Sequence, residues 1–187
     1  ISILPVISIF RNGTYESGDF NIHIYRAMAF YDSLTERNIM PSWAKDLNAT
    51  YGYPLFIFNY PLPYYFISFF HFIGFSFIVS LKILIAITLI LSGIFMYLFS
   101  KVLFKNSLAA FTSAVFYIFT PYHLIDIHFK VTIGEIMSFT LIPLIFLFIH
   151  KLHKTKSLIY IAWSSISFAL LIMSNGLIAF FVAPLML

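Results

Sequence analysis

The sequence predicts an all-helical integral membrane protein, and three observations support this prediction. Of the 187 residues, 61% are hydrophobic and only 10% are charged, and the mean hydropathy is +0.94. A water-soluble fold of this size cannot cover so much apolar surface. Apolar runs approaching the ~20 residues of a bilayer-crossing helix follow one another through the second half of the chain. Lysines gather in short loops between these runs, a pattern that is typical of membrane topology.

The composition also excludes several classes of function. A chain without cysteine forms no disulfide, no thiolate metal site and no cysteine nucleophile. The basic residues give a formal charge of +4 but are dispersed and lack interleaved aromatic residues, so we expect no nucleic-acid partner. The sequence contains no glycine-rich phosphate loop and no dinucleotide fingerprint. We therefore expect no nucleotide, flavin or haem site.

The first third of the chain is a polar stretch that follows a short apolar start. Residues 1–10 have the character of the end of a first membrane helix, and residues 11–59 form a polar loop. Within this loop, residues 19–37 have helical periodicity but are too polar to span, so we expect an amphipathic helix at the membrane surface. Its polar face holds Asp19, His23, Arg26, Phe30, Ser33 and Arg37.

The rest of the chain is predominantly apolar. Residues 60–80 are dense in Pro, Tyr and Phe, and their hydropathy leaves open whether they cross the bilayer or lie in its interface. Over residues 81–187 we expect membrane helices, giving about five in total. Because the chain begins and ends inside apolar runs, we expect a fragment of a longer protein. The clearest runs are Leu81–Leu103, Ser107–Pro121, Gly134–Ile149 and Ser157–Met173.

Loop charge predicts the orientation of these helices. The lysine-bearing loops 101–106 and 150–156 are separated by two helices, so they fall on one side, which the positive-inside rule makes cytoplasmic. The loop 122–133 is then outside. The side of residues 11–59 depends on whether 60–80 crosses the membrane, and two Asn-x-Thr sequons in the loop lean only weakly toward the outside.

Asp19 is the strongest candidate for a catalytic or metal-binding residue. A carboxylate at the start of a helix, one turn from His23 and two from Arg26, can accept a proton from a hydroxyl or approach a divalent cation. The same position also suits an N-cap. His23 and Arg26 share its face and can hold a phosphate or diphosphate, Arg by bidentate hydrogen bonds, or simply face lipid headgroups. The sequence leaves the presence of a metal open.

Two further acidic candidates lie in or beside the second outer loop. Asp126 has the spacing of a surface ion pair with Lys130, which would contribute little. Glu135 opens the next helix, where a carboxylate suits the helix dipole, but an ionisable residue at the edge of an apolar segment is also a functional candidate. The amphipathic rings expected at a headgroup boundary are Trp43, Tyr51 and Tyr53.

Three segments in this order resemble a known family. They are GDFNIHIYRAMAFYDSLTERNIMPSWAKDLNATYGYPLFIFNYPLPYYF, KILIAITLILSGIFMYLFSKVLF and TPYHLIDIHFKVTIGEIMSFTLIPLIFLFI. They resemble the prokaryotic multi-pass proteins known as 6-pyruvoyl-tetrahydropterin synthase-related membrane proteins. These in turn look like the GT-C superfamily of polyprenyl-phosphate-sugar-dependent glycosyltransferases. The pterin name carries no functional weight, because the three-histidine zinc site of a soluble pterin synthase has no counterpart in this sequence.

The resemblance implies a GT-C-like multi-pass helical bundle in the cell membrane. It implies that the first loop, residues 11–59, is helical and extracytoplasmic, and that residues 60–75 pack at the membrane without crossing. On this basis we expect transfer of a sugar from a polyprenyl-phosphate carrier to a cell-envelope acceptor, with membrane lipids as neighbours. The expected catalytic residues are Asp19 and Glu135; His23 and Arg26 would hold the carrier phosphate; Trp43, Tyr51 and Tyr53 would line the acceptor or lipid groove; and Asp126 would close the site.

A non-catalytic membrane protein is the alternative, as a transporter, a flippase or an assembly scaffold for lipid-linked precursors. A transporter predicts polar residues near the bilayer midplane. Here the charges lie at the edges of the apolar runs, and isolated Ser and Thr residues lie within them. This distribution favours a site at the membrane interface.

Overall fold

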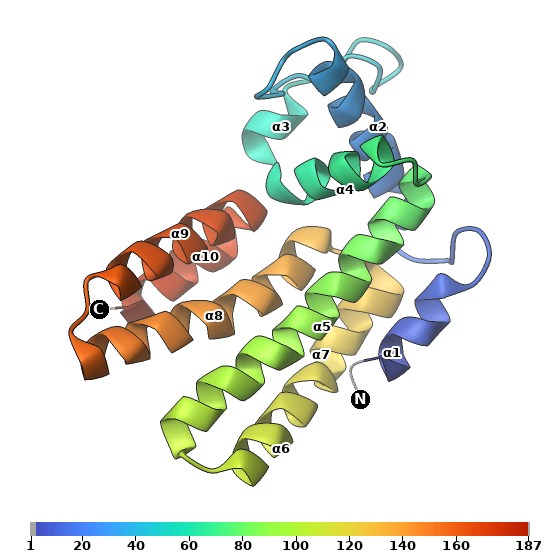
Figure 1. The fold of residues 1–187 in the computed structure, drawn as a ribbon. Coiled ribbons are helices and arrows are strands. Elements are labelled where there is room, and N and C mark those ends of the chain that lie inside the picture. Colours follow the sequence, from blue (N-terminus) through green and yellow to red (C-terminus); the bar gives the residue numbers. More distant parts are fainter. Residues whose placement is uncertain (1–2, 187) are drawn as a thin grey trace.

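The computed structural model describes residues 3–186, and every regular element in that range is helical (Figure 1). Residues 1, 2 and 187, which belong to the expected first helix and to the expected 81–187 segment, lie outside the described residues. The helices are α1 (Leu4–Ile7), α2 (Phe20–Thr35), α3 (Leu55–Phe58), α4 (Leu62–Phe72), α5 (Phe77–Phe104), α6 (Ser107–Ile118), α7 (Pro121–Ile125), α8 (Ile133–Thr155), α9 (Ile159–Ser174) and α10 (Gly176–Val182), with 3-10 turns at Ser8–Phe10 and Ala183–Met186 and a π-helical turn at Asp126–Lys130.

The prediction of an all-helical membrane protein is confirmed, although the described residues contain fewer long helices than expected. Two of them, α5 and α8, are long and apolar enough to cross a bilayer. A third crossing is formed only if α6 and the Pro121–Lys130 segment, bent by 42°, count as one broken span. The expected number of about five therefore includes helices such as α9, which at 16 residues is shorter than a typical crossing.

Local capping explains where the α5–α6 hairpin turns. Ser76 accepts a hydrogen bond from the Val79 amide at the start of α5, and the helix ends at Lys105 in the left-handed conformation. Asn106 then caps α6 by accepting from the next two free amides. At the neighbouring loop, the ammonium of Lys154 donates to the Val102 carbonyl at 3.3 Å. The two lysine-bearing loops therefore lie together at one end of the bundle.

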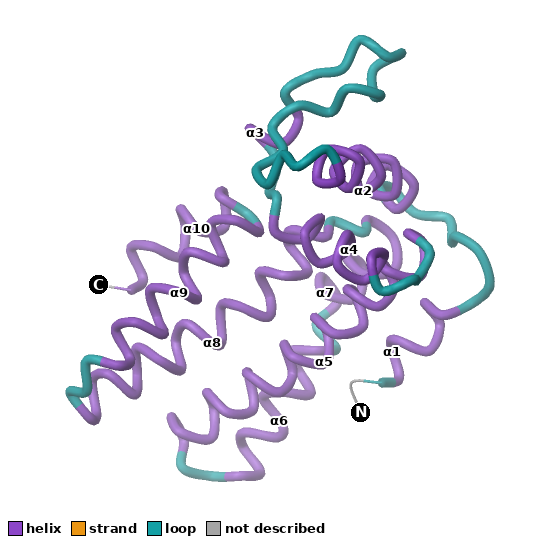
Figure 2. The backbone as a smooth tube through the Cα atoms, turned by 45° about the horizontal axis from the view of Figure 1, so that its top comes forward, coloured by secondary structure: helices purple, strands orange, loops and turns teal. Residues whose placement is uncertain are grey.

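The opposite end carries α2, α3 and α4, which lie across the start of α5 (Figures 1 and 2). Helix α4 packs against α2 and α5, and its 11 residues rise only about 16 Å, about half the thickness of a bilayer core. The 36–54 loop projects away from these helices (Figure 2). Aromatic rings fill the space between α2 and α4, with Phe30 edge-on to Phe56 and Tyr65 and packed beside the buried Tyr64.

Charge divides between the two ends. The end with the two lysine-bearing loops holds five basic residues. The α2–α4 end, taken with the segment before α8 and the first turn of α8, holds the other six basic residues and all seven acidic residues. Any acid–base chemistry that uses carboxylates is therefore confined to the α2–α4 end.

Candidate functional site

Helix α2 turns the polar face predicted for the membrane surface toward the protein interior. His23, Phe30 and Ser33 on this face are buried, whereas Ile22 and Tyr25, which line a cavity together with Arg26, are exposed. Burial of a polar group is tolerated where partners satisfy it, and His23 meets one such partner, the Tyr64 hydroxyl on α4. The part of the polar face that holds His23, Phe30 and Ser33 is therefore packed inside the protein.

Asp19 occupies the N-cap position of α2 but, within the described chain, its carboxylate makes no capping hydrogen bond. Instead, the Ser17 hydroxyl accepts from the Phe20 amide at 3.2 Å. The amides of Gly18 and Asp19 donate to the carbonyls of Phe129 and Lys130 at 2.7 and 2.9 Å. A Cβ at position 18 would lie 3.3 Å from the Lys130 carbonyl oxygen, so glycine permits this close approach. The Asp19 carboxylate is thus positioned by its backbone and is free for another role.

Tyr60 lies between the charged groups of α2 and the start of α8. Burial raises the pKa of its hydroxyl to about 12, the Arg26 charge opposes this shift, and the carboxylates of Asp19 and Glu135 add to it. The hydroxyl also lies beside the backbone of Gly134. Both carboxylates predicted to be catalytic are therefore electrostatic neighbours of the same tyrosine, although they lie more than 100 residues apart in the sequence.

Glu135, in the first turn of α8, and Asp126, in the turn before it, lie in different environments. Glu135 accepts a hydrogen bond from the Tyr122 hydroxyl at 2.5 Å, and the Lys130 ammonium lies 4.7 Å from the centre of the Tyr122 ring. Asp126 is fully buried, and in residues 3–186 neither of its carboxylate oxygens has a partner in normal hydrogen-bond geometry. The surface ion pair between Asp126 and Lys130 does not form among the described residues.

The backbone that carries Asp126 is unusual. It forms a π-helical turn, which ends at Val131 with φ of 60°. A β-branched residue in the left-handed region is strained, and π-turns and strained residues both occur frequently at functional sites.

His23 lies in an environment that does not favour the phosphate contact expected from the sequence. It is fully buried, and its Nδ1 lies 3.0 Å from the Tyr64 hydroxyl. Burial lowers the pKa of the imidazole to about 3, and the positive charge of Arg26 lowers it further. A buried, neutral imidazole is a poor phosphate ligand, so of the two residues expected to hold a phosphate, Arg26 has the more suitable environment.

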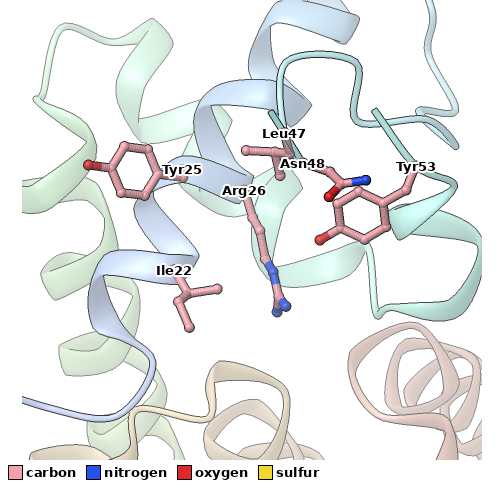
Figure 3. Close-up of a pocket in the computed structure, with 6 residues that line it drawn as sticks. All are labelled: Ile22, Tyr25, Arg26, Leu47, Asn48 and Tyr53. Atoms are coloured by element: carbon pink, nitrogen blue, oxygen red, sulfur yellow. The ribbon is translucent and has the colours of Figure 1, made fainter. Parts of the chain in front are cut away.

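Arg26 extends from α2 into a cavity of about 520 Å³ (Figure 3). Figure 3 shows the ring of Tyr53 facing the Arg26 side chain from the 44–53 loop. Tyrosine hydroxyls surround the guanidinium, and no carboxylate among the described residues forms an ion pair with it. The lining residues are Ile22, Tyr25, Arg26, Leu47, Asn48 and Tyr53.

The other predicted aromatic residues lie outside this cavity. Tyr51 is 84% exposed at the tip of the loop, and Trp43 is half-exposed with its indole packed over Gly52. No three His, Asp or Glu side chains come together as a metal site in the part of the chain that the structure describes. The candidate site therefore has Arg26 and Tyr53 at the cavity, and Tyr60, which does not line the cavity, is within electrostatic reach of Arg26, Asp19 and Glu135.

Tyr60 and Tyr64 are the functional candidates that sequence reasoning missed. Their rings are stacked, with centroids 6.3 Å apart, and they contact both Arg26 and His23. The four-residue spacing in NYPLPYY was the available signal, because residues four apart share a helix face.

Comparison with known proteins identifies the family. Residues 56–187, more than two thirds of the chain, match the family model described as a 6-pyruvoyl-tetrahydropterin synthase related domain of membrane proteins. The chain belongs to this family. The match includes Tyr60, Tyr64, Asp126 and Glu135, and it begins after Asp19 and Arg26. No solved structure matches the chain.

One relative of this 6-pyruvoyl-tetrahydropterin synthase-related protein is an uncharacterized protein of Lactococcus lactis subsp. cremoris (strain MG1363). The two are 25% identical over 161 residues, which cover 84% of this chain and 26% of the relative. The chain thus spans about a quarter of the length of the relative.

Proposed function

We propose that the full-length protein is a GT-C-like membrane glycosyltransferase that transfers a sugar from a polyprenyl-phosphate carrier to a cell-envelope acceptor. One observation carries the proposal: Arg26, which has no carboxylate partner among the described residues, faces a cavity walled by apolar and aromatic side chains and shares Tyr60 as an electrostatic neighbour with Asp19 and Glu135. A single guanidinium beside a hydrocarbon wall suits an amphiphilic phosphate. A nearby carboxylate suits activation of a hydroxyl.

The spacing along α2 fits this chemistry. Asp19 and Arg26 are seven residues apart, a rise of about 10 Å, which leaves room for one sugar ring between a base and a leaving phosphate. The acceptor oxygen attacks the anomeric carbon while Asp19 takes the hydroxyl proton. The bond from the anomeric carbon to the phosphate oxygen breaks, and the electron pair stays on the polyprenyl phosphate. Arg26 stabilises the charge of this leaving group.

We place this site at the outer face of the cell membrane. Five lysines lie at the opposite end of the bundle, and the positive-inside rule assigns such an end to the cytoplasm. Helix α4, too short to cross a bilayer, then lies in the outer interface beneath α2. A carrier lipid in the outer leaflet reaches the Arg26 cavity from this side.

A transfer assay on the full-length protein in liposomes tests the proposal. The liposomes contain polyprenyl-phosphate-linked radiolabelled sugars and an envelope-lipid extract as acceptor. Asp19→Asn keeps the shape of the side chain but removes the base, and we expect a loss of activity of about 100-fold or more. Asp32→Asn is the matched control, since Asp32 lies exposed on the same helix, and it should retain wild-type activity. Normal transfer by Asp19→Asn would disprove the assignment.

A further inference from the structure

The end of the bundle opposite the candidate site carries a concentrated positive charge. It is formed by the α5–α6 and α8–α9 loops, which lie at the lower left of Figure 1. The Lys154 ammonium, 3.3 Å from the Val102 carbonyl oxygen, connects the two loops. Four of the five ammonium-bearing side chains are exposed and the fifth is half-buried. We call this surface the lysine patch; its members are Lys101, Lys105, Lys151, Lys154 and Lys156.

No carboxylate neutralises the lysine patch. Residues 77–125 and 136–187 contain no acidic residue, so neither loop nor the helix ends beside it can supply a counter-charge. In the part of the chain that the structure describes, none of the five ammonium groups forms an ion pair. The acidic residues nearest in sequence, Asp126 and Glu135, belong to the opposite end of the bundle. The charge is therefore available to an anionic partner.

The lengths of α5 and α8 place the lysine patch at the level of the lipid headgroups. The 28 residues of α5 rise about 42 Å and the 23 residues of α8 about 35 Å. Both rises exceed the hydrocarbon core of a bilayer, which is about 30 Å thick. The ends of two apolar helices therefore emerge from the core beside each other, and the lysines lie in their last turns or directly after them.

Aromatic rings accompany the lysines at this end. The Lys101 ammonium lies 5.5 Å from the centre of the Tyr97 ring, and the Lys151 ammonium lies 5.7 Å from that of Tyr160. Trp163, one turn further along α9, is half-exposed. Tyrosine and tryptophan beside basic residues are typical of a membrane-water interface, where the ring meets the acyl region and the cation meets the headgroups.

The backbone of both loops supports a role for the lysines beyond ending a helix. Lys105 and Lys156 are the C-caps of α5 and α8 and adopt the left-handed conformation, with φ of 53° and 56°. Glycine is the usual residue there, because a side chain makes this conformation unfavourable. A cation near a helix C-terminus is favoured by the helix dipole, but Lys101 and Lys154 already supply one in each last turn. Two lysines thus occupy positions where glycine would fit with less strain.

We propose that the lysine patch binds the headgroups of anionic phospholipids, such as phosphatidylglycerol, in the membrane leaflet that it faces. The position at headgroup level and the adjoining aromatic rings favour a lipid over a nucleic acid or an acidic protein. The binding holds this end of the bundle at the membrane surface. It is independent of the proposed sugar transfer, because the Arg26 cavity lies at the other end.

The double variant Lys105→Gly/Lys156→Gly tests the proposal without straining the fold. Glycine suits the left-handed conformation, so we expect the full-length protein to unfold at the same or a higher temperature than wild type. Arg37→Gly/Lys45→Gln is the matched control: it removes two exposed charges from the opposite end, one of them also at a left-handed residue. Lys105→Arg/Lys156→Arg keeps the charge and should behave as wild type.

Native mass spectrometry of the full-length protein in neutral detergent measures the binding of dioctanoyl phosphatidylglycerol and, for comparison, dioctanoyl phosphatidylcholine. A lysine near an anionic surface raises affinity about fivefold. We therefore expect Lys105→Gly/Lys156→Gly to bind phosphatidylglycerol about 10- to 30-fold more weakly, and the control to bind it like wild type. In wild type, salt should weaken the binding of phosphatidylglycerol but leave that of phosphatidylcholine unchanged, because salt screens exposed charges.

Three results would overturn the proposal. The first is equal affinity of wild type for the two lipids. The second is an equal loss of phosphatidylglycerol binding in the glycine variant and the control, which would show a response to net charge alone. The third is displacement of the lipid by an equal concentration of inorganic phosphate or polyglutamate, which would assign the lysine patch to a soluble anion or an acidic protein.

Discussion

Substitution of Gly134 by alanine is a sharp steric test of how the site is assembled. Gly134 lies in the first turn of α8, where it contacts the end of α9 and the ring of Tyr60. A Cβ there would lie 2.4 Å from the Ser174 carbonyl oxygen and 2.8 and 2.9 Å from two carbons of Tyr60. Distances this short do not occur in real proteins, so α8 must move away from the end of α9 and the ring of Tyr60 must shift as well.

The size of the effect follows from two opposing terms. Alanine is favoured over glycine in a helix by about 0.8–1 kcal/mol. Forcing one carbon into a closely packed site costs about 1–3 kcal/mol, and here the nearest atom is backbone, which shifts less easily than a side chain. We therefore expect Gly134→Ala to destabilise the protein by about 1–2 kcal/mol. Gly176→Ala is the control, because Gly176 opens α10 and a Cβ there would meet no atom within 4 Å in the described structure.

Thermal unfolding in detergent, followed by circular dichroism, measures the difference. A loss of 1 kcal/mol lowers Tm by about 2–4 °C in a domain of this size. We expect a lower Tm for Gly134→Ala and an unchanged or slightly higher Tm for Gly176→Ala. Because Tyr60 is displaced, sugar transfer should also fall in Gly134→Ala alone. Equal Tm values for the two variants would refute the close packing of α8, α9 and Tyr60.

Three further predictions concern pH, the N-terminal segment and orientation. The pKa of His23 is lowered to about 3 from its ordinary 6.5, so its contribution to stability is complete above pH 6.5 and is lost as the pH falls toward 3. This contribution is at most about 5 kcal/mol. In denaturant titrations between pH 7 and pH 4, the free energy of unfolding should therefore fall more in the wild type than in His23→Gln, and an equal fall in both proteins would contradict the lowered pKa. Lys82 donates hydrogen bonds to the carbonyls of Arg11 and Gly13 at 2.6 and 2.5 Å. Lys82→Met should therefore make the segment around residues 11–13 more susceptible to limited proteolysis, and an unchanged cleavage pattern would show that these bonds do not hold the segment in place. In the cysteine-free chain, Ser42→Cys in intact cells should react with an impermeant maleimide; protection would place the α2–α4 end in the cytoplasm.

The sequence predicts the long helices well because their signals are local. The apolar runs of α5 and α8 and the Asn106 cap between α5 and α6 depend on neighbouring residues alone. The sequence ends the third apolar run at Pro121 and places residues 122–133 in a loop, whereas in the structure α7 and the π-helical turn occupy Pro121–Lys130. The expected number of about five membrane helices counts short apolar helices such as α9, and by length and composition two helices, or three with the bent pair, reach the size of a span among the described residues.

The interior of the site was harder to predict because its partners are distant in sequence. The buried His23 on α2 meets the Tyr64 hydroxyl, which comes from a helix more than 40 residues away in the sequence. Periodicity shows that His23 and Arg26 share a face, but it does not show which way that face points. The proximity of Asp19 and Glu135 to a common tyrosine depends likewise on tertiary packing.

Photo-crosslinking of a polyprenyl-phosphate sugar tests the central claim most directly, namely that the Arg26 cavity holds such a carrier. A probe with a diazirine in its first isoprene unit is added to the full-length protein in liposomes, and the labelled peptides are sequenced. We predict label on residues that line the cavity, such as Tyr25, Leu47 or Tyr53, and its loss in Arg26→Ala. Label confined to other parts of the protein, or undiminished in Arg26→Ala, would contradict the proposed site.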